Sequence, residues 1–316
     1  MTITQLQYLI AVAEHQNFTI AAEKSFVTQP TLSMQISKLE EELNVKIFDR
    51  GTKPIKLTEV GTKIVEQARK VVIEAERMQD IVSIEKGFIG GPYRLGIIST
   101  VMPTLLPMFL STFVKRYPKV NLIIRELTTD EILTGLREGK LDAAIAATPL
   151  ETSDLIERPL YYEPFVGYLP EGHRLNDKTE LKAEDLNLEE VLLLQDGHCF
   201  RDNILNLCDM NLNNRDKKFT IESGSFETLV QLSDERMGMT LLPYLHTLGL
   251  KENQKKGLKH FEKPEPAREI SLIYSKSELK IQITEALREV ISGIIRGAIS
   301  FHDVQIISPK QKERFR

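Results

Sequence analysis

The sequence predicts a mixed α/β protein in which a helical N-terminal region precedes a larger region of alternating strands and helices. Residues 1–86 carry apolar side chains at helical spacing almost throughout. The stretch GFIGGP at 87–92 interrupts this pattern and is typical of a linker. Beyond it, short apolar runs alternate with helical segments, as in α/β units with largely parallel sheets. A chain of 316 residues has room for two or three compact units.

Composition limits the classes of protein to consider. The chain is 41% hydrophobic and 27% charged, which is ordinary for a globular protein. No apolar stretch reaches the roughly 18–20 residues that span a membrane, and the N-terminus lacks the pattern of a secretory signal. We therefore expect a cytoplasmic protein without a membrane partner. The net charge of −4 argues against a basic coat, but residues 46–70 carry seven bases against three acids and predict a local basic patch.

Three helices are expected within the first fifty residues. The first covers Thr4–His15 and presents Leu6 and Leu9 to a core. A short second helix follows, with Thr19 as its expected N-cap. Thr28 is the expected N-cap of the third helix, where a proline near the first position lacks only an N–H that would be unpaired anyway.

The third helix is predicted to have two faces. Leu32, Ile36, Leu39 and Leu43 fall at helical spacing and should be buried. The outward residues are polar or flexible: Gln29, Thr31, Ser33, Met34, Ser37 and Lys38. Short hydrogen-bonding side chains at the start of a second helix suit readout of the DNA major groove. A helical hairpin with a solvated polar face is the alternative.

The stretch NFTIAAEKSFVTQPTLSMQISKLEEELNVKIFDR, followed by KLTEVG, resembles the signature of LysR-type transcriptional regulators over residues 3–66. The resemblance implies a winged helix-turn-helix domain at 1–58 that binds double-stranded DNA. It implies a phosphate contact for Arg50 and a wing near the minor groove. The residues implied in DNA binding are Gln29, Pro30, Thr31, Ser33, Met34, Arg50, Lys53 and Pro54. Two positions depart from the common pattern, with Asn44 in place of Gly and Met34 in place of Arg.

A long helix is predicted over Lys56–Lys86, with one apolar stripe. The stripe consists of Ile64, Val65, Ala68, Val71, Val72, Ala75, Met78, Ile81 and Val82. A long helix with one apolar face suggests a seam between two chains. The resemblance implies a dimerisation helix and linker at 59–91, a homodimer or homotetramer, and RNA polymerase as a further partner.

The remaining chain is expected to form an α/β effector domain. The expected strands are Tyr93–Ile98, Val120–Leu127, Asp142–Ala147, Phe165–Leu169, Glu190–Leu194, Thr220–Glu222, Met239–Leu242 and Ile270–Tyr274, with helices at Pro103–Arg116, Asp130–Gly139 and Leu279–Gly297. The resemblance implies a domain at 92–302 similar to periplasmic binding proteins. Lobe one would cover 92–160 and 270–302, lobe two 161–269, and a tail 303–316.

Three polar clusters follow predicted strands, at Ser99–Thr100, Thr128–Thr129 and Gly197–Cys199. Ligands bind at the carboxyl ends of strands in open α/β sheets, so these groups are candidates for one cleft. The alternative for each threonine is helix N-capping.

The two cysteines, Cys199 and Cys208, are nine residues apart. If the segment between them is helical, the thiols lie roughly 13 Å apart along its axis, whereas a disulfide needs Cα atoms within roughly 4.4–6.8 Å. A disulfide would therefore require refolding, which describes a redox switch. Two inert buried thiols are an alternative. A metal site is weakly supported, with one nearby histidine and no CxxC, and no metal or cofactor is expected.

The stretch LLLQDGHCFRDNILNLC resembles the redox segment of peroxide-sensing LysR-type regulators. RLGIISTVMPTLLP, GKLDAAIA, ETLVQLSDERMGMTLLP and KPEPAREISLIY extend the resemblance over most of 93–275. It implies Cys199 as the peroxidatic thiol and Cys208 as the resolving thiol. It implies Thr100, Thr129 and His198 around bound hydrogen peroxide, and Arg268 as the group that favours the thiolate. The departures are Ser99 in place of Pro and Ala267 in place of a second Arg.

The predicted function is a hydrogen-peroxide-sensing transcription activator of the oxidative stress response, not an enzyme. One alternative is a LysR-type regulator that senses a metabolite between the lobes and has structural cysteines. Another is a thiol peroxidase that also binds DNA. Formation of a Cys199–Cys208 bridge by peroxide separates the first two readings, and enzyme-like turnover would favour the third.

Overall fold

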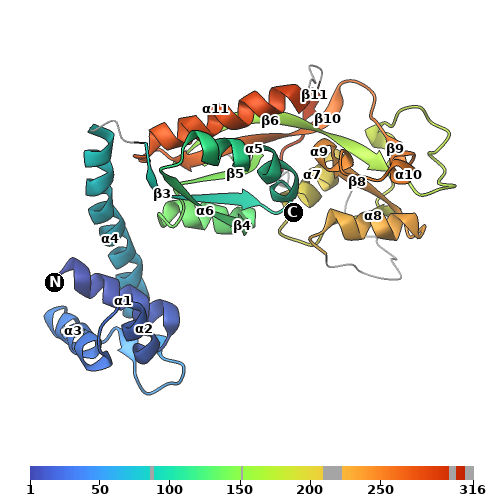
Figure 1. The fold of residues 1–316 in the computed structure, drawn as a ribbon. Coiled ribbons are helices and arrows are strands. Elements are labelled where there is room, and N and C mark those ends of the chain that lie inside the picture. Colours follow the sequence, from blue (N-terminus) through green and yellow to red (C-terminus); the bar gives the residue numbers. More distant parts are fainter. Residues whose placement is uncertain (86–88, 151, 209–222, 299–303, 310–316) are drawn as a thin grey trace. The chain divides into compact units, whose positions relative to one another are not determined.

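The computed structural model describes residues 1–85, 89–150, 152–208, 223–298 and 304–309. It divides into two compact units, Met1–Phe88 and Ile89–Arg316, each of which is described by itself (Figure 1). No helix in the described ranges combines the length and the apolar character needed to cross a membrane.

Unit 1 is a helical domain with a small hairpin. Its elements are α1 Ile3–His15, α2 Phe18–Lys24, α3 Gln29–Glu42, β1 Phe48–Asp49, β2 Lys56–Leu57 and α4 Glu59–Glu85. The two strands pair antiparallel. Leu9 of α1, Ala21 of α2 and Leu32 of α3 are fully buried in one core, so the small Ala21 lets the helices pack closely. This arrangement presents the outer face of α3 to solvent.

The ends of these helices test the sequence predictions. Thr28 caps α3 by accepting a hydrogen bond from the Thr31 amide, as predicted. Asn44, just beyond α3, has a φ of 51°. It therefore adopts the left-handed conformation at the position where the common pattern has glycine. The expected cap of α2 was wrong: Asn17, not Thr19, accepts from the first free amides. Leu43, expected to be buried, is 37% exposed because α3 has ended before it.

Helix α4 has two halves with different environments. It begins at Glu59 rather than Lys56, because Lys56 and Leu57 pair with β1. Val65, Ala68 and Val72 are buried in the core of unit 1. Further along, the predicted stripe is open to solvent, with Met78, Ile81 and Val82 exposed by 67%, 50% and 52%. The second half therefore has an apolar face that the described residues of unit 1 leave uncovered.

Unit 2 is an α/β domain. Its strands are β3 Gly91–Ile98, β4 Val120–Leu127, β5 Ala143–Thr148, β6 Leu155–Tyr168, β7 Val191–Leu192, β8 Met239–Pro243, β9 Leu258–Lys259, β10 Glu265–Ser275 and β11 Val304–Ile306. Its helices are α5 Met102–Arg116, α6 Thr129–Arg137, η1 Ala183–Asp185, α7 Cys199–Leu207, α8 Phe226–Asp234, α9 Tyr244–Thr247, α10 Glu252–Lys255 and α11 Ile281–Ala298. Alternating β and α elements produce the expected fold class.

The strands of unit 2 follow the order β4-β3-β5-β10-β6-β8-β7. Strand β3 is parallel to β4 and β5, whereas β10 runs antiparallel to β5 and β6. The long strand β6 pairs with β10 and then, over Phe165–Tyr168, with β8. Strands β6 and β10 therefore connect two lobes, each with its own hydrophobic cluster.

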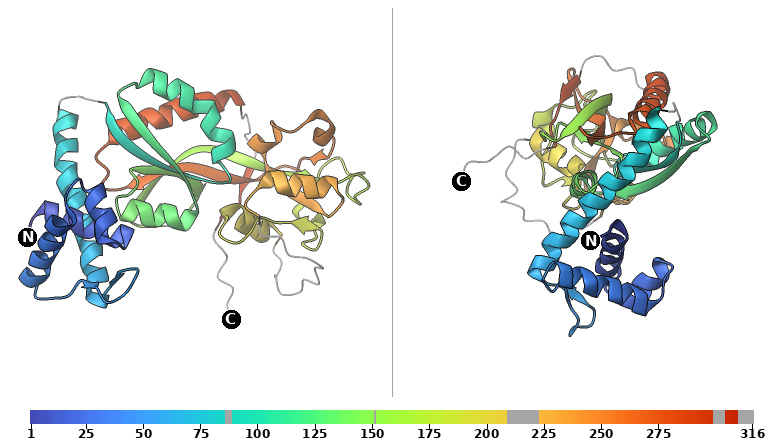
Figure 2. Two further views of the ribbon diagram at one scale, coloured as in Figure 1. Left: turned by 60° about the horizontal axis from the view of Figure 1, so that its bottom comes forward. Right: turned by 90° about the vertical axis from the view of Figure 1, so that its left-hand side faces the viewer.

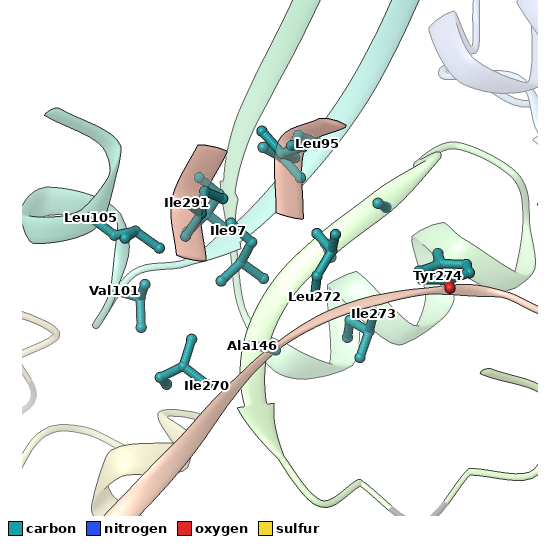
Figure 3. Packing of buried hydrophobic residues seen from close by; sticks show 14 of the residues in the cluster. Leu95, Ile97, Val101, Leu105, Ala146, Ile270, Leu272, Ile273, Tyr274 and Ile291 are labelled. Atoms are coloured by element: carbon teal, nitrogen blue, oxygen red, sulfur yellow. The ribbon is translucent and has the colours of Figure 1, made fainter. Parts of the chain in front are cut away.

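Helices cover both faces of the first lobe's sheet. Leu95 and Ile97 of β3 pack beside Ile291 of α11, as Figure 3 shows. On the opposite face, a Cβ added at Gly96 would lie 3.3 Å from Ile132 of α6, so β3 alternates its side chains between two helical layers. Figure 2 shows the same layers from other directions. The carboxyl end of β3 leads into the segment at Ser99–Thr100.

The predicted strands differ from the observed ones mainly in length. Val120–Leu127 has the predicted bounds. Phe165–Leu169 proved to be the end of the longer β6, whose earlier half contains exposed residues such as Arg158 and Pro159 that hide the strand pattern. Glu190–Leu194 shortens to two residues. The predicted strand Thr220–Glu222 lies outside the described residues.

Candidate functional site

The redox segment predicted from the sequence is a helix with one thiol at each end. Gly197 has a φ of +89°, a conformation that favours glycine, and it turns the chain into α7. Cys199 is the first residue of α7, and Cys208 is its C-cap. The two cysteines form no disulfide with each other in this structure. The structure therefore shows this segment as a helix without a disulfide.

The two thiols are in different hydrophobic clusters. Cys199 is 6% exposed and packs in the cluster of the first lobe. Its neighbour Phe200 packs in the cluster of the second lobe, and Cys208, partly buried, packs against that same cluster. Helix α7 therefore begins at the junction of the two lobes and buries its apolar face in one of them.

Arg268 of β10 is fully buried beside this junction. Its Nη1 donates to Oγ1 of Thr100 over 2.9 Å, and its Nη2 donates to the Thr100 carbonyl over 3.1 Å. The guanidinium also lies over the Phe200 ring, 5.1 Å from the centroid. These contacts join the segment after β3, the start of α7 and strand β10 at one place.

Glu163 of β6 is the partner of this arginine. The antiparallel register of β6 and β10 places the two residues directly opposite each other. Oε2 of Glu163 accepts from Nε of Arg268 over 2.9 Å and from Nη2 over 2.8 Å. Oε1 accepts from the Leu245 amide over 3.0 Å. The side chains are 0% and 1% exposed, so this is a fully buried ion pair in which both members are hydrogen-bonded.

The surroundings of Cys199 act on its thiol in opposite directions. Burial raises the pKa of the thiol above its usual range, and Asp202 adds to this rise. The positive charge of Arg268 and the hydroxyls of Thr129 and Thr100 lower the pKa, but they do not overcome burial. Cys199 is therefore a neutral thiol at physiological pH, with groups around it that favour a thiolate.

The two threonines predicted at the site have distinct environments. Thr100 is 4% exposed and is held by Arg268. Thr129 is the first residue of α6, and its buried Oγ1 has no well-oriented hydrogen-bond partner among the described residues, although it lies close enough to lower the pKa of Cys199. Thr128, by contrast, accepts from the Glu131 amide. The capping alternative thus applies to Thr128 and leaves the Thr129 hydroxyl available.

His198 precedes Cys199 and is 8% exposed. Its Nδ1 lies 3.0 Å from Oγ of Ser99, the residue that departs from the family pattern. Burial lowers the pKa of His198, so the ring is neutral at physiological pH. A Cβ added at Gly224 would lie 2.8 Å from Nε2, which shows that the backbone of Gly224 lies against the ring.

The structure therefore brings together most of the predicted site. Cys199, Thr100, Thr129 and Arg268 converge, His198 is adjacent, and Cys208 stands apart at the other end of α7. Sequence reasoning missed Glu163. The available signal was a single acidic residue inside the otherwise apolar run YYEPFVGYL, because a buried charge requires a partner. In the described part of the chain, His, Cys, Asp and Glu residues form no group of three that would hold a metal ion.

The candidate DNA-reading residues lie on the outer side of unit 1. Gln29, Pro30, Thr31 and Met34 of α3 are exposed, and Ser33 is partly exposed. Lys53 and Pro54 are exposed in the loop between β1 and β2. These residues thus include one helix face and one loop tip, both accessible to a large ligand.

Arg50 is held against α3 rather than extended into solvent. Its Nη2 donates to Oγ of Ser37 and to Oε2 of Glu40, each over 3.1 Å, and the guanidinium lies 5.1 Å from the centroid of Phe18. The Glu40 side chain is 1% exposed, and its Oε1 accepts from the amides of Ile47 and Phe48. Glu40, which the sequence analysis did not identify, therefore fixes both Arg50 and the start of the hairpin.

Comparisons with known families match nearly the whole chain. Residues 3–62 match the family "Bacterial regulatory helix-turn-helix protein, lysR family". Residues 86–293 match the family "LysR substrate binding domain". The boundary between the two matches falls within α4, close to the division between the two structural units.

Individual relatives extend over both units. The hydrogen peroxide-inducible genes activator of Pectobacterium carotovorum subsp. carotovorum is 36% identical over 93% of this chain and 98% of its own length. The DNA-binding transcriptional dual regulator OxyR of Escherichia coli K12 is 36% identical over 93% of this chain and 97% of its own. A solved structure of full-length OxyR from Pseudomonas aeruginosa, with a cysteine replaced by aspartate, superposes with a TM-score of 0.75 at 33% identity and covers 92% of this chain and 98% of that one. A peroxide-bound cysteine mutant of OxyR from Corynebacterium glutamicum reaches a TM-score of 0.61 at 30% identity, covering 94% of this chain and 93% of that one.

Proposed function

The chain belongs to the LysR family of transcription regulators, and from this premise we propose that it senses hydrogen peroxide through Cys199 and Cys208 and activates transcription in response. It is a regulator, not an enzyme. The names of its relatives support peroxide as the signal. The peroxide-bound structure from Corynebacterium glutamicum supports a binding site in this fold.

One observation carries the proposal: a buried thiol at the start of α7 is surrounded by groups that stabilise a thiolate, while a second thiol ends the same helix. An inert core cysteine would not account for the buried Arg268 or for the buried hydroxyl of Thr129, which has no well-oriented hydrogen-bond partner among the described residues. Perturbed groups of this kind are typical of functional sites.

The proposed reaction has two steps. The Cys199 thiolate attacks one peroxide oxygen, so an S–O bond forms, the O–O bond breaks and the second oxygen leaves as hydroxide. The sulfur is oxidised by two electrons to sulfenic acid, and the peroxide is reduced. Thr100, Thr129 and His198 orient the peroxide by hydrogen bonds. The Cys208 thiolate then attacks the sulfenic sulfur, which forms the disulfide and releases hydroxide that takes up a proton as water.

The disulfide changes the regulator because α7 does not accommodate it. Nine residues of helix rise by roughly 13 Å, so the two sulfurs meet only after the helix has unwound. Unwinding removes Cys199 from one hydrophobic cluster and Cys208 from the other. We propose that this rearrangement of unit 2 alters how the assembled regulator engages its DNA.

The DNA side of the proposal uses unit 1. Gln29, Pro30, Thr31, Ser33 and Met34 face bases, Arg50 contacts phosphate, and Lys53 and Pro54 lie on a wing at the minor groove. The uncovered apolar half of α4 pairs with a second copy, giving a homodimer or a homotetramer. RNA polymerase is the partner through which activation occurs.

The test treats the reduced full-length protein with one equivalent of hydrogen peroxide and maps its thiols by mass spectrometry. A Cys199–Cys208 bridge is expected, together with a changed footprint on promoter DNA. In Cys208→Ser, Cys199 should stop at sulfenic acid, detectable with dimedone. If both thiols persist, the peroxide role is refuted and sensing of a metabolite between the lobes takes its place.

A further inference from the structure

We propose that Glu163 is a positioning residue that restrains the reactivity of Cys199, because its carboxylate offsets most of the positive charge that Arg268 presents to the sulfur. The inference rests on the proposed peroxidatic role of Cys199. Glu163 lies within β6, outside the redox helix and outside the polar clusters that follow the predicted strands. Its basis is the geometry of the buried ion pair.

The first step is the position of the charges. On one edge of Arg268, Nη1 and Nη2 donate to Thr100 in the segment after β3, and the guanidinium lies over the Phe200 ring of the redox helix. Glu163 occupies Nε and shares Nη2 on the other side. Because both side chains are buried, bulk solvent screens the carboxylate only weakly from its surroundings. Cys199 therefore experiences a paired arginine, whose field is weaker than that of a free cation.

The second step is that Arg268 does not depend on Glu163 alone for its position. Two hydrogen bonds to Thr100 and the stacking on Phe200 remain when the carboxylate loses its charge. A Gln at position 163 keeps one oxygen for the arginine or for the Leu245 amide. Removal of the Glu163 charge should thus leave the Arg268 guanidinium in place, without a negative charge beside it.

The third step is the state of the thiol. Arg268 lowers the pKa of Cys199, yet burial holds that pKa above its usual range. Asp202 opposes thiolate formation from α7, and the hydroxyls of Thr129 and Thr100 favour it. Burial is the largest cause of the raised pKa, and a carboxylate beside the main cation would add to it by weakening the effect of Arg268. A sensor gains from this restraint, because a protonated sulfur is slow towards weak oxidants and alkylating agents.

The experiment measures thiol alkylation by iodoacetamide as a function of pH in the reduced, full-length protein, with Cys199 and Cys208 quantified separately by peptide mass spectrometry. In Glu163→Gln, the midpoint for Cys199 should fall by about one pH unit. At pH 7 the lower pKa increases the fraction of Cys199 that is thiolate, but a thiolate of lower pKa is also a weaker nucleophile. The alkylation rate at pH 7 should therefore rise by only about threefold. The rate for Cys208 in the same sample should not change, which makes it an internal control.

Two further variants isolate the mechanism. In an Arg268→Gln background, Glu163→Gln should have no effect on the Cys199 midpoint, because a buried Glu163 without its cation is protonated and has no charge left to remove. If circular dichroism shows that Glu163→Gln is unfolded, Glu163→Asp tests the same idea, since a charge withdrawn by one methylene should give a smaller fall in the midpoint.

The proposal is overturned by an unchanged or higher midpoint for Cys199, by an equal shift in both cysteines, or by a shift that persists without Arg268. These outcomes are independent of peroxide chemistry. If wild-type protein fails to form a disulfide, the proposed function is refuted while the alkylation data still decide the role of Glu163.

Discussion

Cys199 and Cys208 begin and end the same helix, yet their side chains pack in the hydrophobic clusters of two different lobes. Any bond between them must therefore remove both sulfurs from apolar surroundings. The helix between them must also give up its backbone hydrogen bonds. Formation of a disulfide should therefore change the structure of α7.

Oxidation should unwind α7. After one equivalent of hydrogen peroxide, the amides of Asp202–Leu207 should exchange with solvent at least about a hundredfold faster, because unfolded segments lose the protection of helical hydrogen bonds. Hydrogen exchange with mass spectrometry measures this. Cys208→Ser treated in the same way is the control and should stay protected. Unchanged protection in the disulfide-bonded protein would refute the refolding model.

The reactivity of Cys199 should depend steeply on pH. Burial raises the pKa of its thiol, so the thiolate is a small fraction at pH 7 and increases about tenfold with each pH unit. Alkylation of Cys199 should therefore continue to rise well above pH 8.5, which is about the midpoint for an unperturbed cysteine thiol. The native state binds this proton more tightly than the unfolded state, so the contribution of Cys199 to stability should fall as the pH rises from about 8.5 towards the raised pKa of the folded state. A plateau in Cys199 alkylation below pH 8 would contradict this prediction.

Local features of the fold could be predicted from the sequence, whereas contacts between distant residues could not. The helices of unit 1 and the N-cap at Thr28 are local features, so spacing and turn chemistry were enough to predict them. The partners of Arg268 are not local. Glu163 is 105 residues away, and the pair exists only because β6 and β10 adopt one register. Strand β6 was underestimated for a related reason, since its solvent-facing half lacks an apolar pattern.

Glu40 should be more important for unit 1 than its surface neighbours. Glu40→Ala leaves the amides of Ile47 and Phe48 buried without an acceptor and should cost about 3 kcal/mol of stability in this unit. Glu40→Gln keeps an acceptor and should cost about 1 kcal/mol. Hydrogen exchange of the α3 amides reports these losses. Glu41→Ala, at the adjacent exposed position, is the control and should stay within about 0.5 kcal/mol of wild type.

The segment after α11 should depend on α7 for its attachment. Nδ2 of Asn203, a fully buried residue, donates to the Ile307 carbonyl over 2.7 Å, and Nδ2 of Asn206 donates to the Ser308 carbonyl over 2.9 Å. Strand β11 also pairs with β10. Asn203→Ala should therefore weaken the docking of this segment by about 1–2 kcal/mol. Faster exchange of the Ile307 amide measures this loss.

The matched control is Asn121→Ala on the exposed side of β4, which should leave that amide unchanged. If Asn203→Ala also leaves the amide of Ile307 unchanged, the pairing of β11 with β10 is sufficient by itself and the side-chain amide contributes nothing to docking. The result matters for the oxidised protein, because unwinding α7 would remove both asparagine donors at once.

Gly224 should be intolerant of a side chain although it is exposed to solvent. A Cβ at this position would lie 2.8 Å from Nε2 and 3.1 Å from Cε1 of His198, and Nδ1 of that ring is held by Ser99. Gly224→Ala should therefore push the imidazole away from its place and slow the oxidation of Cys199 by about 10–100-fold, the effect expected when a polar group is misplaced by about 1 Å.

Gly293→Ala is the control, because nothing lies within 4 Å of its added Cβ and a helical alanine is favoured over glycine by about 1 kcal/mol. Stopped-flow measurement of sulfenic acid formation compares the two variants, and equal rates would show that the position of His198 is not needed for the reaction.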